Sequence, residues 1–160
     1  MIRAVILDHN AISLSHGPLY PGAAEFVRQC AERFPVVLTT SHSHQVTERD
    51  PPIAQIRNLL LDIISADEVE RGKPAPDILI ATLGRIGFLL RDRNPVEPLE
   101  CLVVDSTPLG VIAARGAGMR SLALAHTFSR EQLSAADFVR DSFDAVDLDE
   151  ILRLCLSPRP

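Results

Sequence analysis

Tryptophan is absent from this chain of 160 residues, and aromatic residues make up only 4% of it. Long hydrophobic runs are also missing, because no apolar stretch approaches the ~20 residues that a membrane-spanning helix needs. Only a short apolar run precedes Asp8, so the N-terminal segment lacks the hydrophobic part of a signal peptide. We therefore expect a cytoplasmic protein without a membrane partner.

Clustered basic residues and paired cysteines are lacking as well. The formal net charge is −5 and the arginines are scattered, which argues against a nucleic-acid partner. The three cysteines, Cys30, Cys101 and Cys155, are far apart and form no CxxC motif. Neither a disulfide framework nor a zinc–thiolate site is indicated. A small-molecule partner is expected instead.

The chain does have 46% hydrophobic and 23% charged residues, a composition typical of a globular protein. A domain of this size buries about 70% of the surface that its unfolded chain exposes. The polar, proline-containing segment 91–98 is too short to separate two domains. We expect a single domain over residues 1–160.

Short apolar runs that end at a polar residue predict the strands. They cover residues 2–7, 36–38 and 101–104, and two weaker runs cover 63–64 and 121–125. Unalternating β-branched runs of this length are typical of strands buried on both faces of a parallel sheet.

Amphipathic spacing, with prolines near helix starts, predicts helices between these runs. The predicted helices cover residues 21–34, 76–88, 108–117, 131–139 and 149–156, and two short helices joined at Pro51-Pro52 lie within residues 44–61. Strands alternating with helices predict an α/β fold, a doubly wound, Rossmann-like parallel sheet of about five strands. In such a fold, functional groups gather at the carboxyl ends of the strands.

Asp8 and Asp105 each follow a buried strand, which predicts that both lie at one edge of the sheet. Two carboxylates there repel each other unless a cation lies between them, and oxygen ligands favour Mg²⁺. Lys73 lies where a loop enters a helix, and Thr39 and Thr40 add hydroxyl and amide donors. This combination suits a phosphoryl group, whose transfer depends mostly on positioning and charge neutralisation.

Four motifs occur in the order of a known family. They are residues 4–12 (AVILDHNAI), 37–41 (VLTTS), 72–77 (GKPAPD) and 104–119 (VDSTPLGVIAARGAGM). In these motifs, and at Ser15, the chain resembles the haloacid dehalogenase-like (HAD) hydrolase superfamily, particularly its phosphoglycolate phosphatase and β-phosphoglucomutase-like branch. Each motif alone is weak, whereas four in order are specific.

The resemblance implies a role for each residue. Asp8 is the expected nucleophile that forms an aspartyl-phosphate, and Thr39 with the Thr40 amide holds the phosphate. Lys73 steadies the negative charge, while Asp8, the Asn10 carbonyl and Asp105 bind Mg²⁺. The expected substrate is a small phosphorylated molecule or an exposed phosphate on a larger substrate.

The chain departs from the family pattern at three positions. Asn10 stands where the family has its general acid/base, and losing such a group typically lowers the rate by about 10²–10⁴-fold. Ala11 replaces a glycine, and Val104 replaces an acid. We expect a slow phosphatase. The alternatives are a catalytically inactive HAD-fold binding or regulatory protein, and a hydrolase of another bond.

A cap domain is missing from the expected position. Only residues 12–20 separate the first motif from Pro21-Gly22, where the resembling branch carries a helical cap of many tens of residues. An uncovered site suits a bulky substrate or coverage by another subunit of a homo-oligomer.

All five histidines, His9, His16, His42, His44 and His126, fall just beyond the predicted strands. Residues 41–44 (Ser-His-Ser-His) suggest a transition-metal site, and His9 or His42 could replace the acid that is missing at Asn10. Solvated loop histidines are the alternative.

Overall fold

The computed structural model describes residues 1–14, 17–91 and 94–159. Ser15, His16 and residues 92–93 of the polar segment lie outside the described residues, so the expectations for them are untested.

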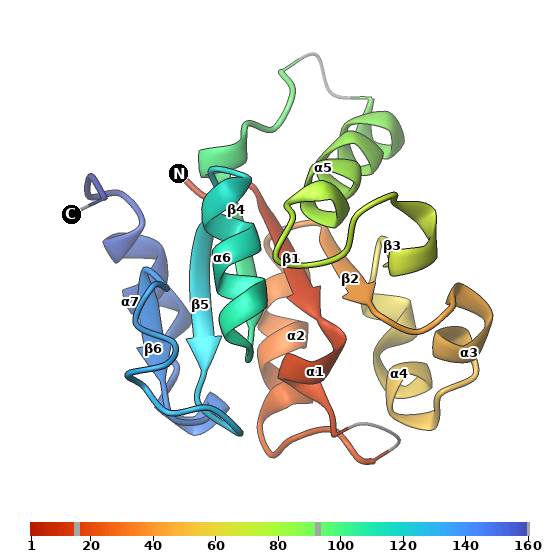
Figure 1. The fold of residues 1–160 in the computed structure, drawn as a ribbon, viewed down its shortest axis with the longest axis horizontal. Helices are drawn as coiled ribbons and strands as arrows, with labels where there is room; N and C mark the ends of the chain where they lie inside the picture. Colours follow the sequence, from red (N-terminus) through yellow and green to blue (C-terminus); the bar gives the residue numbers. More distant parts are fainter. Residues whose placement is uncertain (15–16, 92–93, 160) are drawn as a thin grey trace.

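Six strands form one parallel sheet in the order β3-β2-β1-β4-β5-β6 (Figure 1). They are β1 (Ala4–Asp8), β2 (Val36–Thr40), β3 (Asp62–Ser65), β4 (Cys101–Asp105), β5 (Arg120–Leu124) and β6 (Phe138–Arg140). The five strands predicted from the apolar runs are confirmed. The chain adds β2 and β3 on one side of β1, and β4, β5 and β6 on the other. The carboxyl ends of strands at such a switch point border a crevice in which ligands bind.

Helices follow most of the strands. They are α1 (His9–Ile12), α2 (Ala23–Ala31), α3 (His44–Glu48), α4 (Pro51–Ile56), α5 (Asp77–Leu90), α6 (Pro108–Gly116) and α7 (Leu148–Leu154), with short 3₁₀ turns at Arg57–Leu59, Ala66–Glu68, Pro98–Glu100 and Phe143–Ala145. The predicted break at Pro51-Pro52 is confirmed, since α3 ends before it and α4 begins at Pro51. Thr107 caps the start of α6, because its hydroxyl accepts from the Gly110 amide.

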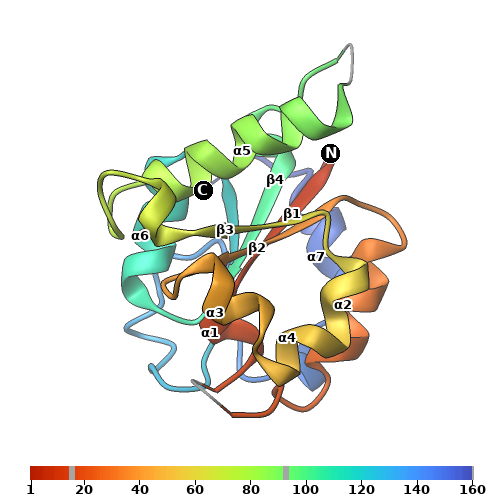
Figure 2. The same ribbon diagram turned by 90° about the vertical axis from the view of Figure 1, so that its right-hand side faces the viewer.

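The helices cover both faces of the sheet, as Figure 2 shows for α5 and α6 on one side and α2 and α7 on the other. Alternate residues of β1 face the two layers because side chains alternate along a strand. Val5 and Leu7 pack in the core cluster with α2, α4 and α7. Ala4 and Ile6 pack in the cluster with α5 and α6. Both faces are therefore buried, which explains the unalternating apolar runs.

The helix predicted over residues 131–139 is wrong. The segment forms isolated turns, and residues Phe138–Arg140 pair with β5 as a sixth, edge strand. Asp137 decides this, because its carboxylate accepts from the Ser121 amide at 2.8 Å and pairs with Arg120 and Arg159. The helix-favouring composition of this segment is overridden by these tertiary contacts.

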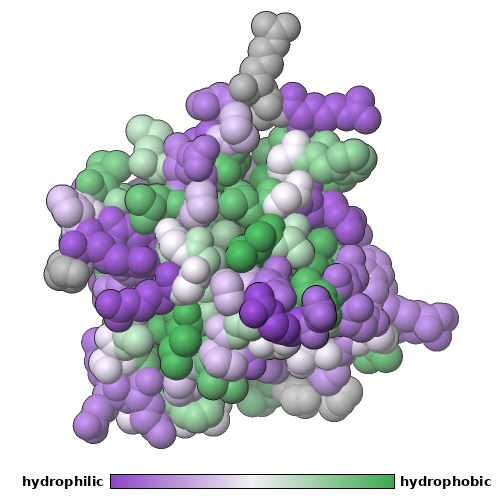
Figure 3. Space-filling view, turned by 45° about the horizontal axis from the view of Figure 1, so that its top comes forward, coloured by the Kyte–Doolittle hydropathy of each residue, from purple (hydrophilic) through white to green (hydrophobic). Residues whose placement is uncertain are grey.

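Hydrophobic side chains also reach the surface on the face that carries α5 and α6, where they are interspersed with hydrophilic ones (Figure 3). The exposed side chains of these helices include Ile80, Phe88 and Ile112. Across the described ranges, no helix has the length and apolar character needed to span a membrane.

We expect Asp137→Ala to lower the free energy of unfolding by about 3–5 kcal/mol, because it leaves the buried Arg120 guanidinium without its carboxylate partner. The Arg120 and Asp137 side chains are only 8% and 6% exposed. Asp141→Ala is the matched control, since the Arg130–Asp141 pair is 57% and 72% exposed and should contribute under about 1 kcal/mol. Urea unfolding of both variants measures the difference, and equal effects would contradict the assignment.

Candidate active site

Asp8 ends β1 at the point where the sheet order reverses, and it is only 6% exposed. Its carboxylate caps the short helix α1, because Oδ2 accepts from the Asn10 amide at 3.0 Å. The Asn10 carbonyl in turn accepts from the Ser106 hydroxyl at 3.2 Å. These bonds link the turn after β1 to the turn after β4.

Asp105 ends the neighbouring strand β4 and is 1% exposed. Its Oδ1 accepts from the Ser106 amide at 2.8 Å and from the Thr107 amide and hydroxyl at 2.9 Å each. Gly110, in the first turn of α6, packs directly against this carboxylate, and a Cβ built there would overlap its oxygens. The start of α6 therefore fixes the side chain of Asp105 tightly.

Lys73 lies between the two carboxylates, at the place where the sequence analysis expects Mg²⁺. Its Nζ is 2.7 Å from Asp8 Oδ1 and 2.5 Å from Asp105 Oδ2. Lys73 comes from the loop before α5, so this contact joins three segments that are far apart in the sequence.

One lysine does not neutralise two buried carboxylates. Burial and the nearby Asp105 carboxylate raise the pKa of Asp8 to about 6, although Lys73 and the backbone N–H of Asn10 lower it. Burial alone would lower the pKa of Lys73, but Asp8 and Asp105 outweigh it and raise that pKa. The cluster therefore retains an excess of negative charge at neutral pH.

A cavity of about 630 Å³ opens beside this cluster. Its lining residues are Asp8, Asn10, Thr40, Ser41, Ala66, Val69, Gly72, Lys73, Ile78, Thr107, Pro108, Leu109 and Phe128. Thr39 is not among them, and its buried hydroxyl donates to the Leu7 carbonyl at 3.4 Å. The structure thus brings five of the six predicted site residues to one locality around the cavity and turns the Thr39 hydroxyl toward β1.

The oxygen atoms near the excess charge fit a hard divalent cation. Carboxylates of Asp8 and Asp105 and the main-chain carbonyl of Asn10 are the ligand types that Mg²⁺ takes, and Mg²⁺ keeps several waters in such sites. Among the described residues, no group of three or more His, Cys, Asp or Glu side chains is arranged to hold a metal. A cation here therefore depends on the carbonyl as well as on the two carboxylates.

A sequence model described as haloacid dehalogenase-like hydrolase matches residues 2–118 of this chain. The chain belongs to the haloacid dehalogenase-like hydrolases. The resemblance seen in the four motifs is therefore confirmed, together with the Rossmann-like fold that it implied.

Relatives of this HAD-like chain include named proteins and a solved structure. SUPPRESSOR OF QUENCHING 1, chloroplastic, of Arabidopsis thaliana is 31% identical over 83% of this chain and 12% of its own length. Validoxylamine A 7'-phosphate phosphatase of Streptomyces hygroscopicus subsp. limoneus is 31% identical over 72% and 51%. A mutant of CbbY from Rhodobacter sphaeroides, in complex with xylulose-(1,5)bisphosphate, is 25% identical with a TM-score of 0.65 over 81% of this chain and 56% of that chain. The chain spans about half, or less, of the length of these relatives.

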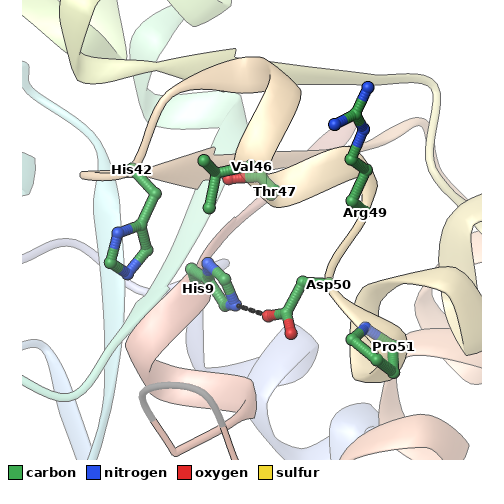
Figure 4. A pocket seen from close by; sticks show the side chains of 7 residues that line it. All are labelled: His9, His42, Val46, Thr47, Arg49, Asp50 and Pro51. Carbon is green, nitrogen blue, oxygen red and sulfur yellow. Dashed lines mark hydrogen bonds and ion pairs between the residues drawn. The ribbon is translucent and has the colours of Figure 1, made fainter.

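A second, smaller cavity of about 210 Å³ in this HAD-like chain is lined by His9, from the turn after β1, and by residues of the segment 42–51 (Figure 4). His9 lines it and is only 5% exposed. Its Nε2 lies 3.0 Å from Asp50 Oδ2, and its Nδ1 lies 3.1 Å from the Thr40 hydroxyl. Thr40 also accepts from the Thr47 hydroxyl and the His42 amide, each at 3.2 Å. The Thr40 hydroxyl is therefore bound by three residues that line the smaller cavity.

Among the described residues, the other histidines, His42, His44 and His126, do not line the larger cavity beside Asp8. His42 also lines the smaller cavity, with its ring centroid 5.7 Å from that of His9, and His44 lies 3.7 Å from Glu48. His126 stacks on Tyr20 at a centroid distance of 3.7 Å. The geometry thus places neither His9 nor His42 among the residues that line the larger cavity beside Asn10.

The sequence did not identify Ser41 as a residue of the larger cavity, nor did it predict the contact between His9 and Asp50. The signal for Ser41 is its hydroxyl group directly after β2, one residue beyond Thr39 and Thr40. The His9–Asp50 contact spans 41 positions, and no local pattern signals it.

We expect Gly110→Ala to lower the free energy of unfolding by about 1–3 kcal/mol, because the added methyl group displaces the tightly held Asp105 carboxylate. Gly84→Ala is the matched control, since a Cβ at this α5 position meets nothing within 4 Å and should stabilise the helix by up to about 1 kcal/mol. Chemical denaturation measures both. A harmless Gly110→Ala would contradict the close approach of α6 to Asp105.

We expect the Asp8 carboxyl of metal-free protein to titrate near pH 6 rather than near 3.8. Because its folded pKa is raised, its contribution to the free energy of unfolding falls as the pH rises through this interval. Carbon-13 NMR in the presence of a chelator measures the midpoint, and Asp8→Asn assigns the signal. A midpoint near 3.8 would contradict the charge excess.

Proposed function

We propose that the protein is a magnesium-dependent phosphatase that hydrolyses phosphate monoesters through an aspartyl-phosphate on Asp8. The observation that carries the proposal is the cluster of Asp8, Lys73 and Asp105 at the reversal point of the sheet, beside a cavity of about 630 Å³. Named phosphatases among the relatives of this HAD-like chain support it.

The phosphate would bind where Lys73, Thr40 and Ser41 line the cavity. This differs by one residue from the sequence-based expectation, which assigned the contact to the Thr39 hydroxyl and the Thr40 amide. Thr39 takes a supporting role in this proposal, since its hydroxyl bonds to the Leu7 carbonyl beside Asp8.

In the first step, a carboxylate oxygen of Asp8 attacks phosphorus, and the bond from phosphorus to the ester oxygen breaks. Lys73 holds positive charge against the attacking carboxylate and the phosphate oxygens. In the second step, water attacks the phosphorus of the aspartyl-phosphate, which releases phosphate and restores Asp8. Apart from the attack by Asp8, the protein contributes to both steps mainly through positioning and charge neutralisation.

Asp8, the Asn10 carbonyl and Asp105 would hold Mg²⁺. When bound, Mg²⁺ supplies positive charge against the phosphate oxygens and balances the excess negative charge of the two carboxylates.

Asn10 limits this chemistry. Its amide cannot give a proton to the departing alkoxide, so poor leaving groups should react slowly. The same observation favours the second candidate, a HAD-fold binding or regulatory protein without turnover.

The proposal describes a single domain over residues 1–160 without an inserted cap, because only residues 9–22 connect β1 to α2. An open site of this kind suits a small phosphorylated molecule, an exposed phosphate on a larger substrate, or coverage by a second copy of the chain. We also propose a cytoplasmic location, which the three free and buried cysteines favour.

We expect Asn10→Asp to raise the turnover of an alkyl phosphate by about 10²–10⁴-fold in the presence of Mg²⁺, because a carboxyl group can protonate the leaving alkoxide. An activated aryl phosphate should gain much less, since its leaving group needs little protonation. Steady-state release of phosphate measures both substrates.

Asp8→Asn in the same background is the control and should abolish hydrolysis of both substrates. If Asn10→Asp hydrolyses neither substrate although Mg²⁺ still raises the melting temperature, the binding-protein candidate replaces the phosphatase.

A further inference from the structure

The larger cavity is polar at one end only. Its polar end is held together by hydrogen bonds among Asp8, Asn10 and Lys73, with Thr107 joined to the cluster through Asp105. Thr40 and Ser41 add hydroxyl groups to the lining, and Gly72 adds no side chain. The other lining residues are apolar, namely Ala66, Val69, Ile78, Pro108, Leu109 and Phe128. A ligand whose phosphate binds at Lys73 therefore meets carbon rather than hydrogen-bonding groups beyond it.

The apolar wall is anchored in the hydrophobic core. Ile78 is 4% exposed and belongs to the core cluster between the sheet and α5, against which Ala66 and Val69 also pack. Phe128 packs on a separate cluster formed by Val111, Ala123 and Leu133. These side chains cannot easily turn away to make room for polar groups, so the apolar character of the wall is a fixed property of the site.

Leu109 extends this wall from the first turn of α6, with 51% of its surface exposed. It follows Thr107 and Pro108 directly, so the same turn that holds Asp105 carries an apolar side chain at the cavity. A Cβ added at Gly72, which also lines the cavity, would meet nothing within 4 Å. Room for a bulky group therefore remains next to Lys73.

Hydroxyl groups and hydrocarbon groups respond oppositely to such a wall. A hydroxyl placed against it loses its hydrogen bonds to water without gaining new ones. Each methylene group that leaves water for it increases affinity by about fourfold. The volume of about 630 Å³ is within the range of small-molecule sites and exceeds what a phosphate group alone fills.

We propose that the substrate is a phosphate monoester of an apolar alcohol or phenol, with its hydrocarbon group against Val69, Ile78, Leu109 and Phe128. This inference rests on the proposed function, because it takes the Lys73 end as the phosphate site. It separates this chain from the CbbY relative, whose structure holds a sugar bisphosphate.

The test measures binding, so it does not depend on turnover. Methyl-, propyl- and hexylphosphonate, which are not hydrolysed, are titrated into the Mg²⁺-loaded protein by calorimetry. Affinity should rise about fourfold for each added methylene group that is buried, and by roughly 10²-fold or more from methyl to hexyl. A propylphosphonate with two hydroxyl groups should bind more weakly than propylphosphonate itself.

Two variants of α6 locate the hydrocarbon group. Leu109→Ser should weaken hexylphosphonate binding about fivefold to tenfold and leave methylphosphonate unchanged. Ile112→Ser is the matched control, since Ile112 lies on the same helix, is 48% exposed and does not line the cavity. Equal losses in both variants, or no loss in Leu109→Ser, would overturn the placement.

The outcomes separate the two proposals. Equal affinities along the phosphonate series would overturn the apolar substrate and leave the phosphatase intact. No binding of any phosphonate would overturn both, because the Lys73 end then holds no phosphate. Chain-length-dependent binding without hydrolysis of an activated aryl phosphate would support the apolar site and count against the phosphatase.

Discussion

The ammonium group of Lys73 between two buried carboxylates is the contact on which this site depends. Asp8 and Asp105 end adjacent strands, so the sheet itself forces their charges together. Without a cation between them, burying both would be strongly unfavourable. Lys73 bonds to both, and the loop before α5 is thereby tied to the centre of the sheet.

The same arrangement leaves the site short of positive charge. One ammonium faces two carboxylates, and the raised pKa of Asp8 reflects this imbalance. A binding partner for this end of the cavity therefore has to bring a cation with it or accept a partly protonated Asp8. Six apolar side chains line the same cavity, so they offer a ligand hydrophobic burial rather than hydrogen bonds.

Sequence patterns predicted most of this structure because its strands are buried on both faces and end in polar residues. The sequence predicts that Asp8 and Asp105 lie close together, since parallel strands place their carboxyl ends at one edge. Lys73 lies at no strand end, and its position in a loop that enters a helix indicated its place. Residues 131–139 failed because a helix-favouring composition gave way to the pairing of Asp137 with Arg120. The sequence does not distinguish the positions of Thr39 and Thr40 relative to the cavity. Adjacent strand residues face opposite sides, and a pair of threonines carries no mark of which one faces the cavity.

The turn after β1 links the two cavities, because its residues line both of them. Asp8 and Asn10 border the larger cavity, whereas His9 between them borders the smaller one and is held by Asp50. Thr40, whose hydroxyl contacts His9, borders the larger cavity from β2. Thr47 of α3 and Asp50, which precedes α4, therefore support the turn that carries Asp8 through their contacts with Thr40 and His9. A substitution at Asp50 would therefore disturb the turn that carries Asp8 without changing any residue that lines the larger cavity.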